Sequence, residues 1–385
     1  MKVVQLGCGI TGLVCAEELA GNAKVTDLVL ADSRTEGAEA LSRRLGSDKI
    51  DVVKTDATDK KAIAEALADS DVVVCSLPWD LNGRVLETAV DKGVNYVDFC
   101  ISKEAFDDFD KVDRMCKNAG ITAITAVGLE PGISDTLARY AANKLDSVEE
   151  AHVIDGDNGV VEGGGFVLTW SPIDWIDELC VPAAVFRDGK IEYIPPLREK
   201  ETYEFPQPIG TLPVYKTLHD ETFLMPKHIK GIRNADFRIG VDDEFAMVAR
   251  MLKKLGLHRK EPVDVKGVKV SPLDVVVALM PRPVDLAGKI KGHGGTVVEI
   301  TGKKDGKRTM IKMWAFASHE KSYDRYGTNA TGYLVGIGGA VPTEMLIEGM
   351  VKEKGLLVPE QLPAEEFVRR LKEKGLAVNE KITAF

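Results

Sequence analysis

The stretch KVVQLGCGITGLVCAEELAGNAKVTDLVLAD, residues 2–32, decides the fold. Lys2–Leu6 is an apolar run of the strand type, Thr11–Leu19 has helical spacing, and Leu28–Ala31 is a second apolar run. The turn between the first strand and the helix fits the pattern G-x-G-x-x-G, and Asp32 lies 20 positions beyond its last glycine. This order of strand, glycine-rich turn, helix, strand and acid predicts a Rossmann unit that binds a dinucleotide.

Each residue of the turn has a physical role in that prediction. Gly7 allows the tight turn, Gly9 lets a pyrophosphate approach the backbone, and Gly12 lets helix and strand pack closely. Ile10 and Thr11 open the helix, whose N-terminal N–H groups and dipole attract phosphates. The alternative is a tight turn without a ligand, which the surrounding strand, helix and acid make the weaker interpretation.

The adenosine end of the cofactor is expected at Asp32, which can accept hydrogen bonds from ribose hydroxyls and whose charge opposes a 2′-phosphate. This favours NAD, while Arg34 could meet such a phosphate and leaves NADP as the alternative. Ligands of such sheets bind beyond the carboxyl ends of the strands. Further cofactor contacts are therefore expected at Ser33, Asp56, Ala57, Ser76, Leu77 and Pro78. For Asp56 a turn leading into the next helix is an equal alternative, and Asp59 is expected to cap that helix.

The chain predicts an α/β architecture of two domains. Strands and helices alternate through residues 1–130, which indicates a doubly wound parallel sheet. Residues 131–324 carry Asp188-Gly189 and Asp305-Gly306 between strand-like runs, which predicts hairpins and an inserted α+β domain with an antiparallel sheet. Residues 325–385 are expected to return to the Rossmann domain as helices.

Composition excludes several classes of function. The 385 residues carry a formal charge of −10 and the pI is about 5.3, which disfavours binding to nucleic acid. No apolar run approaches the roughly 18 residues of a membrane span, and the N-terminus shows no signal-peptide pattern. Six cysteines without a C-x-x-C pair favour a reducing cytoplasm, and the histidines lack the spacing of a metal site.

Four further segments carry a resemblance to a known family. They are GLEPGISDTLA from residue 128, Trp170-Ser171-Pro172, AAVFRDGKIEYIPP from residue 183, and GLLVPEQ from residue 355. Together and in this order they resemble the saccharopine dehydrogenase and L-lysine 6-dehydrogenase family over nearly the whole chain. The resemblance implies a Rossmann domain, an inserted domain for substrate binding and homodimerisation, and hydride transfer at a carbon bearing an amine.

The chain departs from the family pattern at several positions. The family carries Asp in place of Glu130 and a Tyr near Cys100, and its glycine-rich turn is altered here to residues 155–158, DGDN. An N-R-D-S run of the family is replaced by LHDE at 218–221, so that His219 stands in place of the Arg. That Arg binds a substrate carboxylate in the family, and its replacement argues against saccharopine itself.

Three residues are candidates for catalysis. Glu130 lies where the parallel sheet ends and could bind a substrate ammonium or relay a proton; an acid leading a helix is the equal alternative. His219 has a suitable intrinsic pKa for acid–base chemistry, although a structural histidine is as consistent with the sequence. Asp220 beside Glu221 could recognise an amino group, or the two acids could lie in a solvated turn.

The predicted substrate contacts are Cys100, Asp155, Trp170, Glu221 and Arg233. Trp170 could form an apolar wall along a methylene chain, and Arg233 could bind a carboxylate. Burial of Trp170 in the core and exposure of Arg233 on a strand are the simpler alternatives.

These features predict an NAD(P)-dependent amino-acid dehydrogenase acting on the CH–NH group of a lysine-type amino acid. One alternative is the reductive condensation of an amine with an aldehyde, as in saccharopine or carboxynorspermidine synthesis. The other alternative is a non-catalytic module that senses NAD(H).

Overall fold

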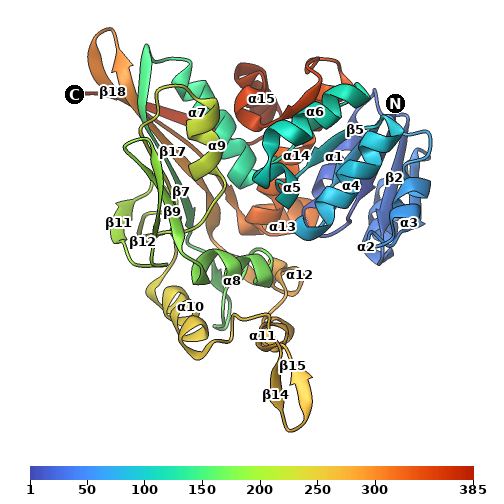
Figure 1. The fold of residues 1–385 in the computed structure, drawn as a ribbon, viewed down its shortest axis with the longest axis horizontal. Coiled ribbons are helices and arrows are strands. Elements are labelled where there is room, and N and C mark those ends of the chain that lie inside the picture. The colour runs from blue at the N-terminus through green and yellow to red at the C-terminus, as the bar shows by residue number, and fades with distance from the viewer. The chain divides into compact units, whose positions relative to one another are not determined.

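The computed structural model describes residues 1–385 and divides into two compact units (Figure 1). Unit 1 comprises Met1–Arg139 and Gly332–Leu376, and unit 2 comprises Tyr140–Thr331 and Ala377–Phe385. The chain therefore passes from the first unit to the second and back, as expected of an insertion, and then returns once more to the second unit.

Unit 1 contains a seven-stranded parallel sheet in the order β19-β6-β5-β4-β1-β2-β3. The strands are β1 (Lys2–Leu6), β2 (Asp27–Asp32), β3 (Ile50–Lys54), β4 (Val72–Cys75), β5 (Asn95–Asp98), β6 (Thr122–Ile124) and β19 (Gly355–Leu357). Every residue of the central strand β4 is buried. The first six strands coincide with the strand-like runs that the sequence pattern indicates at Lys2–Leu6, Leu28–Ala31, Asp51–Val53, Asp71–Leu77, Val94–Phe99 and Ile121–Val127. The direction of winding reverses between β1 and β4, which is where doubly wound sheets bind their ligands.

The connections between these strands are helical. They are α1 (Gly12–Gly21), α2 (Glu36–Leu45), α3 (Lys60–Ala66), α4 (Trp79–Lys92), α5 (Lys103–Asp107) and α6 (Phe109–Ala119). The sequence pattern does not indicate α2, because only Ala38 and Leu41 of this helix are buried. The five other helices lie within or overlap the helical segments that the sequence pattern indicates at Thr11–Leu19, Lys60–Ala68, Val85–Ala89 and Phe106–Ala119.

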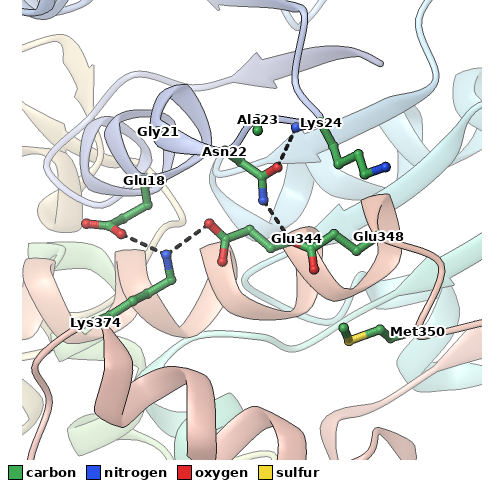
Figure 2. Close-up of a pocket in the computed structure, with 9 residues that line it drawn as sticks. All are labelled: Glu18, Gly21, Asn22, Ala23, Lys24, Glu344, Glu348, Met350 and Lys374. Atoms are coloured by element: carbon green, nitrogen blue, oxygen red, sulfur yellow. Dashed lines mark hydrogen bonds and ion pairs between the residues drawn. The ribbon is translucent and has the colours of Figure 1, made fainter.

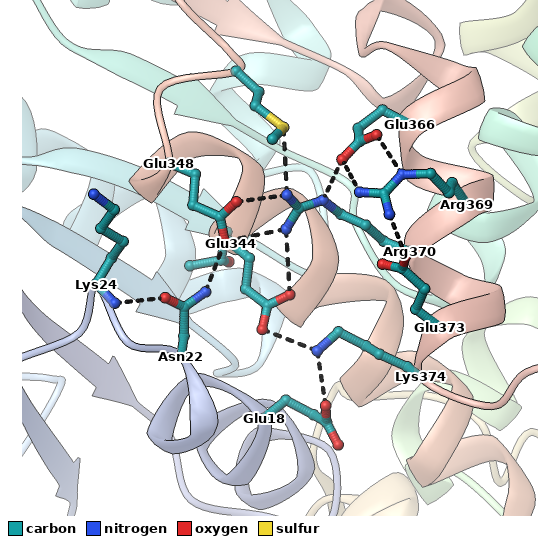
Figure 3. Close-up of polar contacts among 12 residues, drawn as sticks. Glu18, Asn22, Lys24, Glu344, Glu348, Glu366, Arg369, Arg370, Glu373 and Lys374 are labelled. Atoms are coloured by element: carbon teal, nitrogen blue, oxygen red, sulfur yellow. Dashed lines mark hydrogen bonds and ion pairs between the residues drawn. The ribbon is translucent and has the colours of Figure 1, made fainter.

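Two C-terminal helices, α14 (Ala330–Ile347) and α15 (Ala364–Glu373), supply most of the returning segment of unit 1. Lys374, just after α15, bridges Glu18 of α1 at 2.8 Å and Glu344 of α14 at 2.9 Å (Figure 2). Arg370 pairs with Glu348 and with Glu366 in the same network (Figure 3). Acidic and basic side chains of α1, α14 and α15, and of the residues just after α14 and α15, form one network of ion pairs. These ion pairs connect the two C-terminal helices to α1.

Unit 2 is built on a nine-stranded mixed sheet. Its main path runs β10-β9-β13-β7-β17-β18-β20, and β12 joins β11 to β13. The strands are β7 (Ser147–Asp157), β9 (Ala183–Arg187), β10 (Lys190–Ile194), β11 (Lys200–Glu204), β12 (Thr211–Lys216), β13 (Asn234–Gly240), β17 (His293–Lys304), β18 (Lys307–Ser318) and β20 (Val378–Ala384). Only the pair β13 and β7 is parallel, so the predicted antiparallel character holds for the other pairs.

Both predicted hairpins of unit 2 are confirmed. Asp188-Gly189 joins β9 to β10 and Asp305-Gly306 joins β17 to β18. All four of these turn residues have positive φ, between 47° and 83°, which is the conformation that a two-residue turn between twisted strands requires.

The helices of unit 2 lie between its strands in sequence. They include α8 (Pro172–Cys180), α9 (Glu221–His228), α10 (Asp243–Leu255), α11 (Pro272–Leu279), α12 (Pro283–Leu286) and α13 (His319–Tyr326), while α7 (Ser134–Ala142) leads into the unit. Two short pairs, β14 (Val263–Val265) with β15 (Val268–Val270) and β8 (Val160–Val161) with β16 (Ile290–Lys291), complete the unit.

The end of the chain differs from the sequence-based expectation. Residues 325–385 are predicted to return to the Rossmann domain, but β20 pairs with β18 in the sheet of unit 2. The segment VNEKITA alternates too weakly to indicate a strand, and most of its residues are exposed. The segment forms a strand because its backbone pairs with the edge of β18 that is otherwise uncovered.

Candidate functional site

The glycine-rich turn of unit 1 is shaped by close contacts. Gly7 has a φ of +89°, and a Cβ there would lie 2.5 Å from the Ser76 carbonyl oxygen. A Cβ on Gly12 would lie 2.1 Å from the Gly7 carbonyl oxygen and 2.3 Å from Ser76 Oγ. The Ser76 hydroxyl donates to the Gly7 carbonyl at 2.8 Å and accepts from Gln5 Nε2 at 3.1 Å. Ser76 therefore stabilises the turn through these contacts, and Gln5 in turn holds Ser76. Gln5 was not predicted from the sequence.

The outer side of the same turn is open. No atom lies within 4 Å of a Cβ built on Gly9, and Gly9 itself is exposed. Ile10 and Thr11 are partly exposed at the start of α1, where the first helical N–H groups are found. The space that a Cβ would fill and these N–H groups fit a dinucleotide pyrophosphate.

Asp32, at the end of β2, has a fixed orientation. Its Oδ2 accepts from the Cys8 N–H at 2.6 Å, and its Oδ1 accepts from the Arg34 N–H at 2.8 Å. Each carboxylate oxygen can accept a second hydrogen bond, so both oxygens can still receive ribose hydroxyls. Ser33 and the Arg34 side chain are exposed beside it.

The loops after β3 and β4 contain the other predicted cofactor residues. Asp56 accepts from the N–H and hydroxyl of Thr58, at 2.9 and 2.7 Å, which is the turn alternative of the sequence analysis. Asp59 caps α3 as expected by accepting from the Lys61 N–H at 2.9 Å. Ala57 is buried, Leu77 is partly exposed and Pro78 is exposed before α4.

Glu130 and Cys100 follow strands of the same sheet. Glu130 lies in the turn Leu129–Ile133, where its own backbone is extended, and is partly exposed while the other four residues of the turn are buried. Cys100 is exposed, and its carbonyl accepts from Asn82 Nδ2 at 2.8 Å. Both residues lie beyond the carboxyl ends of parallel strands, where a substrate of a Rossmann enzyme is expected.

Unit 2 contains a cluster of carboxyl groups around one imidazole, termed the acidic cluster below. Its members come from three separate segments of the chain, and they are Asp155 and Asp157 of β7, Glu178 of α8, and His219, Asp220 and Glu221 at the start of α9. His219 Nδ1 shares a hydrogen bond with the Glu221 carboxyl group, and the imidazole stacks on Phe237 with ring centroids 3.9 Å apart. The cluster thus has a fixed imidazole at its centre.

The charges of the acidic cluster act strongly on one another. Burial works against a charged His219, but Glu221, Glu178 and Asp220 raise its pKa to about 10. Burial raises the pKa of Glu178 to about 8 and that of Asp220 to about 6. Burial and then the charges of Asp157 and Glu178 raise the pKa of Asp155 well above its usual value.

The acidic cluster lacks a compensating base. No lysine or arginine forms an ion pair with Asp155, Glu178 or Asp220, although all three remain partly exposed. Buried carboxyl groups normally pair with cations, so their accumulation here indicates a place for a cationic ligand.

Several aromatic side chains, which come from segments near the acidic cluster in sequence, contact one another. Phe166 stacks on Phe245 at 5.2 Å, and Trp175 meets both rings edge-on. Trp170 lies 6.1 Å from Phe245, and its buried Nε1 has no hydrogen-bond partner. Because Trp175 and Glu178 share α8, this helix contributes both an aromatic and an acidic side chain.

Arg233 does not belong to the acidic cluster. Its side chain is 68% exposed and pairs with Asp188 at 3.2 Å. Asp155 is opposite Ile239 in the parallel pair β7 and β13, whereas Arg233 precedes the start of β13. Arg233 is therefore about 20 Å away along the strand, at ~3.3 Å per residue. The exposed-strand alternative applies to this residue.

Sequence analysis missed Glu178 and did not place Asp157 and His319 in a site. Asp155 and Asp157 are two residues apart on a strand, so their side chains share a face, and this spacing was available as a signal. Glu178 follows Trp170-Ser171-Pro172 within the next helix, but nothing in the local sequence distinguishes it from a solvated helix acid.

The structure offers neither a metal site nor a membrane-spanning helix. No group of three or more His, Cys, Asp or Glu side chains is arranged to hold a metal ion. None of the helices combines the length and apolar character that crossing a membrane would require.

Two family models match the chain. The saccharopine dehydrogenase NADP binding domain covers residues 3–124, and the saccharopine dehydrogenase C-terminal domain covers residues 128–376. The chain belongs to the saccharopine dehydrogenase family. The predicted family is thereby confirmed, and the protein is an NAD(P)-dependent dehydrogenase of that family with a Rossmann domain for the dinucleotide.

Relatives within this family differ in the reactions that their names describe. Carboxyaminopropylagmatine dehydrogenase from a Synechocystis species is 25% identical over 98% of this chain and 97% of its own. Carboxynorspermidine synthase from Vibrio cholerae is 27% identical over 98% of this chain and 96% of its own.

Two solved structures share the fold of this saccharopine dehydrogenase family member. Apo saccharopine dehydrogenase (L-Glu forming) from Saccharomyces cerevisiae gives a TM-score of 0.75 at 20% identity, with both chains covered completely. Homospermidine synthase from Legionella pneumophila in complex with NAD gives 0.73 at 15% identity, covering 99% of this chain and 91% of that one.

Proposed function

We propose that the chain joins a cationic amine to an amino-acid aldehyde by reductive condensation. The observation that carries this proposal is the acidic cluster, in which Asp155, Glu178 and Asp220 have no lysine or arginine partner. A substrate such as saccharopine brings several carboxylates, which such a cluster would repel. A diamine or guanidinoamine brings the positive charges that the cluster lacks.

The proposed reaction balances as an amine, an aldehyde, NAD(P)H and a proton giving a secondary amine, NAD(P)⁺ and water. The amine nitrogen forms a bond to the aldehyde carbon, water leaves, and the C=N carbon then receives a hydride. NAD(P)H supplies that hydride when bound to the Rossmann unit. The side chains hold the two reactants, move protons and exclude competing partners.

Glu178 is the proposed base that removes a proton from the attacking ammonium. An acid–base group works best when its pKa lies near the working pH, and burial raises that of Glu178 to about 8. Asp155 and Asp220 are proposed to hold a second positive charge of the same amine.

His219 is the proposed counterpart for the carboxylate of the aldehyde. Its pKa of about 10 keeps it positively charged at neutral pH, and it stands where the family has an Arg. Nδ1 is engaged with Glu221, so Nε2–H is the donor proposed for the substrate. Glu130 and Cys100 keep their predicted roles near the cofactor as part of this proposal, and Trp170 that of an apolar wall.

The names of the relatives support an amine substrate. Carboxyaminopropylagmatine dehydrogenase and carboxynorspermidine synthase are named after products that contain agmatine or norspermidine. This agrees with the excess negative charge of the acidic cluster in the present chain.

The test is the oxidation of NADPH and NADH, followed by near-ultraviolet absorbance, with a panel of amines and aldehydes. The amines are propane-1,3-diamine, putrescine, agmatine, lysine and glutamate, and each is paired with the semialdehydes of aspartate and of 2-aminoadipate. We expect turnover with a diamine or agmatine, lost in Glu178→Gln and retained in the surface control Arg233→Ala. Turnover restricted to 2-aminoadipate semialdehyde with glutamate as the amine would overturn the proposal.

The second candidate is a dehydrogenase acting on the CH–NH group of a lysine-type amino acid. The ε-ammonium of lysine would also fit the acidic cluster, and both family models carry the saccharopine dehydrogenase name. Reduction of NAD or NADP by lysine alone, without any aldehyde, distinguishes this candidate from reductive condensation.

We also propose that the protein is a homodimer of the cytoplasm that prefers NAD. The six cysteines, five of them buried, form no disulfide with one another and support a reducing compartment. Asp32 supports the NAD preference. Sedimentation of a monomer at micromolar concentration would refute the dimer.

A further inference from the structure

Beside the acidic cluster, a buried histidine has both ring nitrogens engaged. His319 is the first residue of α13 and is 0% exposed. Its Nδ1 accepts from the Ala330 N–H at 3.1 Å, so the ring proton is on Nε2. Nε2–H then donates to Asp157 Oδ1 at 3.1 Å. The backbone thus selects the tautomer that faces the carboxylate.

Asp157 is held by more than this histidine. The Gly159 N–H donates to the same Oδ1 at 2.6 Å. A Cβ on Gly159 would lie 2.7 Å from Oδ1, and a Cβ on Gly294 would lie 2.8 Å from Oδ2. Hydrogen bonds from His319 and Gly159, and the close approach of Gly159 and Gly294, therefore restrict this carboxylate to one position.

We propose that His319 is a positioning residue for the amine substrate, because it fixes the Asp157 carboxylate in one orientation beside Asp155. The inference rests on the proposed function, since it assigns how part of the acidic cluster is prepared for a cation. His319 acts through Asp157 and does not itself meet the substrate.

The two aspartates have different tasks in this scheme. Hydrogen bonds from His319 and Gly159 fix the orientation of the Asp157 carboxylate. Burial and then the charge of Asp157 raise the pKa of Asp155 well above its usual value. An arriving ammonium group would offset these negative charges, which lowers the pKa of Asp155 and favours contact of both aspartates with the cation.

Other titratable groups act on the same place. Glu178 also raises the pKa of Asp155, and His219 lowers it. Near His319, His293 is the first residue of β17 and Glu320 is the second residue of α13, and burial lowers the pKa of His293. A pH profile of amine binding must therefore be compared between variants that differ only at residue 319.

The experiment compares His319→Gln with His319→Asn in the full-length protein. The Gln amide can reach the place of Nε2 and donate to Asp157, whereas the Asn amide occupies the place of Nδ1 and serves only Ala330. Steady-state KM for the best amine of the panel, KM for the cofactor, and calorimetric amine binding at pH 6 to 9 are measured. Asp157→Asn, which keeps the shape and removes the charge, is the second variant.

We expect His319→Asn and Asp157→Asn to raise the amine KM at least tenfold, with cofactor KM within twofold of wild type. His319→Gln should recover most of the affinity, and wild type should release more protons on amine binding than His319→Asn does. Wild-type amine KM in both His319→Asn and Asp157→Asn, or equal loss in the Gln and Asn variants, overturns the positioning role alone. A wild-type protein that neither binds nor turns over any amine overturns the proposed function, and this inference with it.

Discussion

The molecule contains two charge clusters that differ in how their acids are paired. In unit 1, each of Glu18, Glu344, Glu348 and Glu366 contacts Arg370 or Lys374, and this group is termed the balanced network because every acid has a base partner. In unit 2, the bases that pair with the five carboxyl groups of the acidic cluster are the imidazoles of His219 and His319, and Asp155, Glu178 and Asp220 have no lysine or arginine partner.

The difference separates a structural role from a binding role. Every acid of the balanced network already has a base partner, so the hollow that it lines in Figure 2 is explained by helix attachment. An unbalanced cluster keeps several carboxyl groups protonated or exposed until a cation arrives. Charge balance, more than the presence of a hollow, therefore points to the substrate.

The largest expected effect comes from Glu178→Gln. We expect kcat/KM for the amine to fall about 100-fold, or about 2.7 kcal/mol, because a base and a cation partner are lost. The melting temperature should stay the same or rise, since a desolvated acid is removed. Enzyme assays measure the change in kcat/KM, and thermal denaturation measures the change in melting temperature. A matched change in the balanced network, Glu344→Gln, should do the reverse and lower stability without changing kcat/KM.

Next in size is the loss of a base from the balanced network. Lys374→Met removes the ammonium group that Glu18 and Glu344 share, and we expect a loss of about 3 kcal/mol in the free energy of unfolding. Urea denaturation gives this value, and the amine KM should be unchanged. Lys372→Met, on the exposed side of the same segment, is the control. Equal stability of both variants would contradict the structural role of the network.

The two clusters should also differ in their pH dependence. The folded-state pKa values of Glu178, Asp220 and His219, about 8, 6 and 10, all lie above the unfolded values. Stability from these groups is present at low pH and is lost as pH rises toward those values. In the balanced network Arg369 and Arg370 lower the pKa of Glu366 to about 2, so its contribution is lost only in acid.

We therefore expect the melting temperature of the free protein to fall by a few degrees between pH 6 and pH 8. Saturating amine should reduce the fall, and Glu178→Gln should reduce it as well. Differential scanning calorimetry across this range measures the slope. A flat profile in the wild-type protein would show that the acidic cluster is not protonated as described.

The smallest effect is expected at the cofactor site, where charge is again unmatched. The Arg34 side chain is exposed beside Asp32 and no acid pairs with it. Arg34→Ala should raise KM for NADP about fivefold, because a phosphate partner is lost, and leave KM for NAD unchanged. Arg43→Ala on the neighbouring helix is the control. A response of NAD and NADP to the same extent would exclude Arg34 from phosphate recognition.

The Rossmann unit was predictable because its signals are local. The six strands, the glycine-rich turn and Asp32 each lie in a short stretch of sequence whose residue types meet one geometric requirement. The open space at Gly9 is an example. Both Asp-Gly hairpins were predictable for the same reason. The last strand was not, since β20 depends on a neighbouring edge that the local sequence does not reveal.

The acidic cluster shows where local signals end. His219, Asp220, Glu221 and Asp155 were candidates because of their types and their family-like positions, but the same residues fit ordinary turns. Glu178 had no signal at all, and Arg233 had a plausible but incorrect one. Only the packing of β7, α8 and α9 shows which acids influence one another's ionisation.

The sequence by itself determined the dinucleotide turn, the family and the order of the two domains, because each depends on residues close together in the chain. The tertiary structure alone decided which carboxyl groups accumulate without a base, and that His319 holds Asp157 with a defined tautomer. The physical reason is that ionisation depends on burial and on charges brought together through space. Segments 155–157, 178 and 219–221 acquire that shared environment only when the second unit folds.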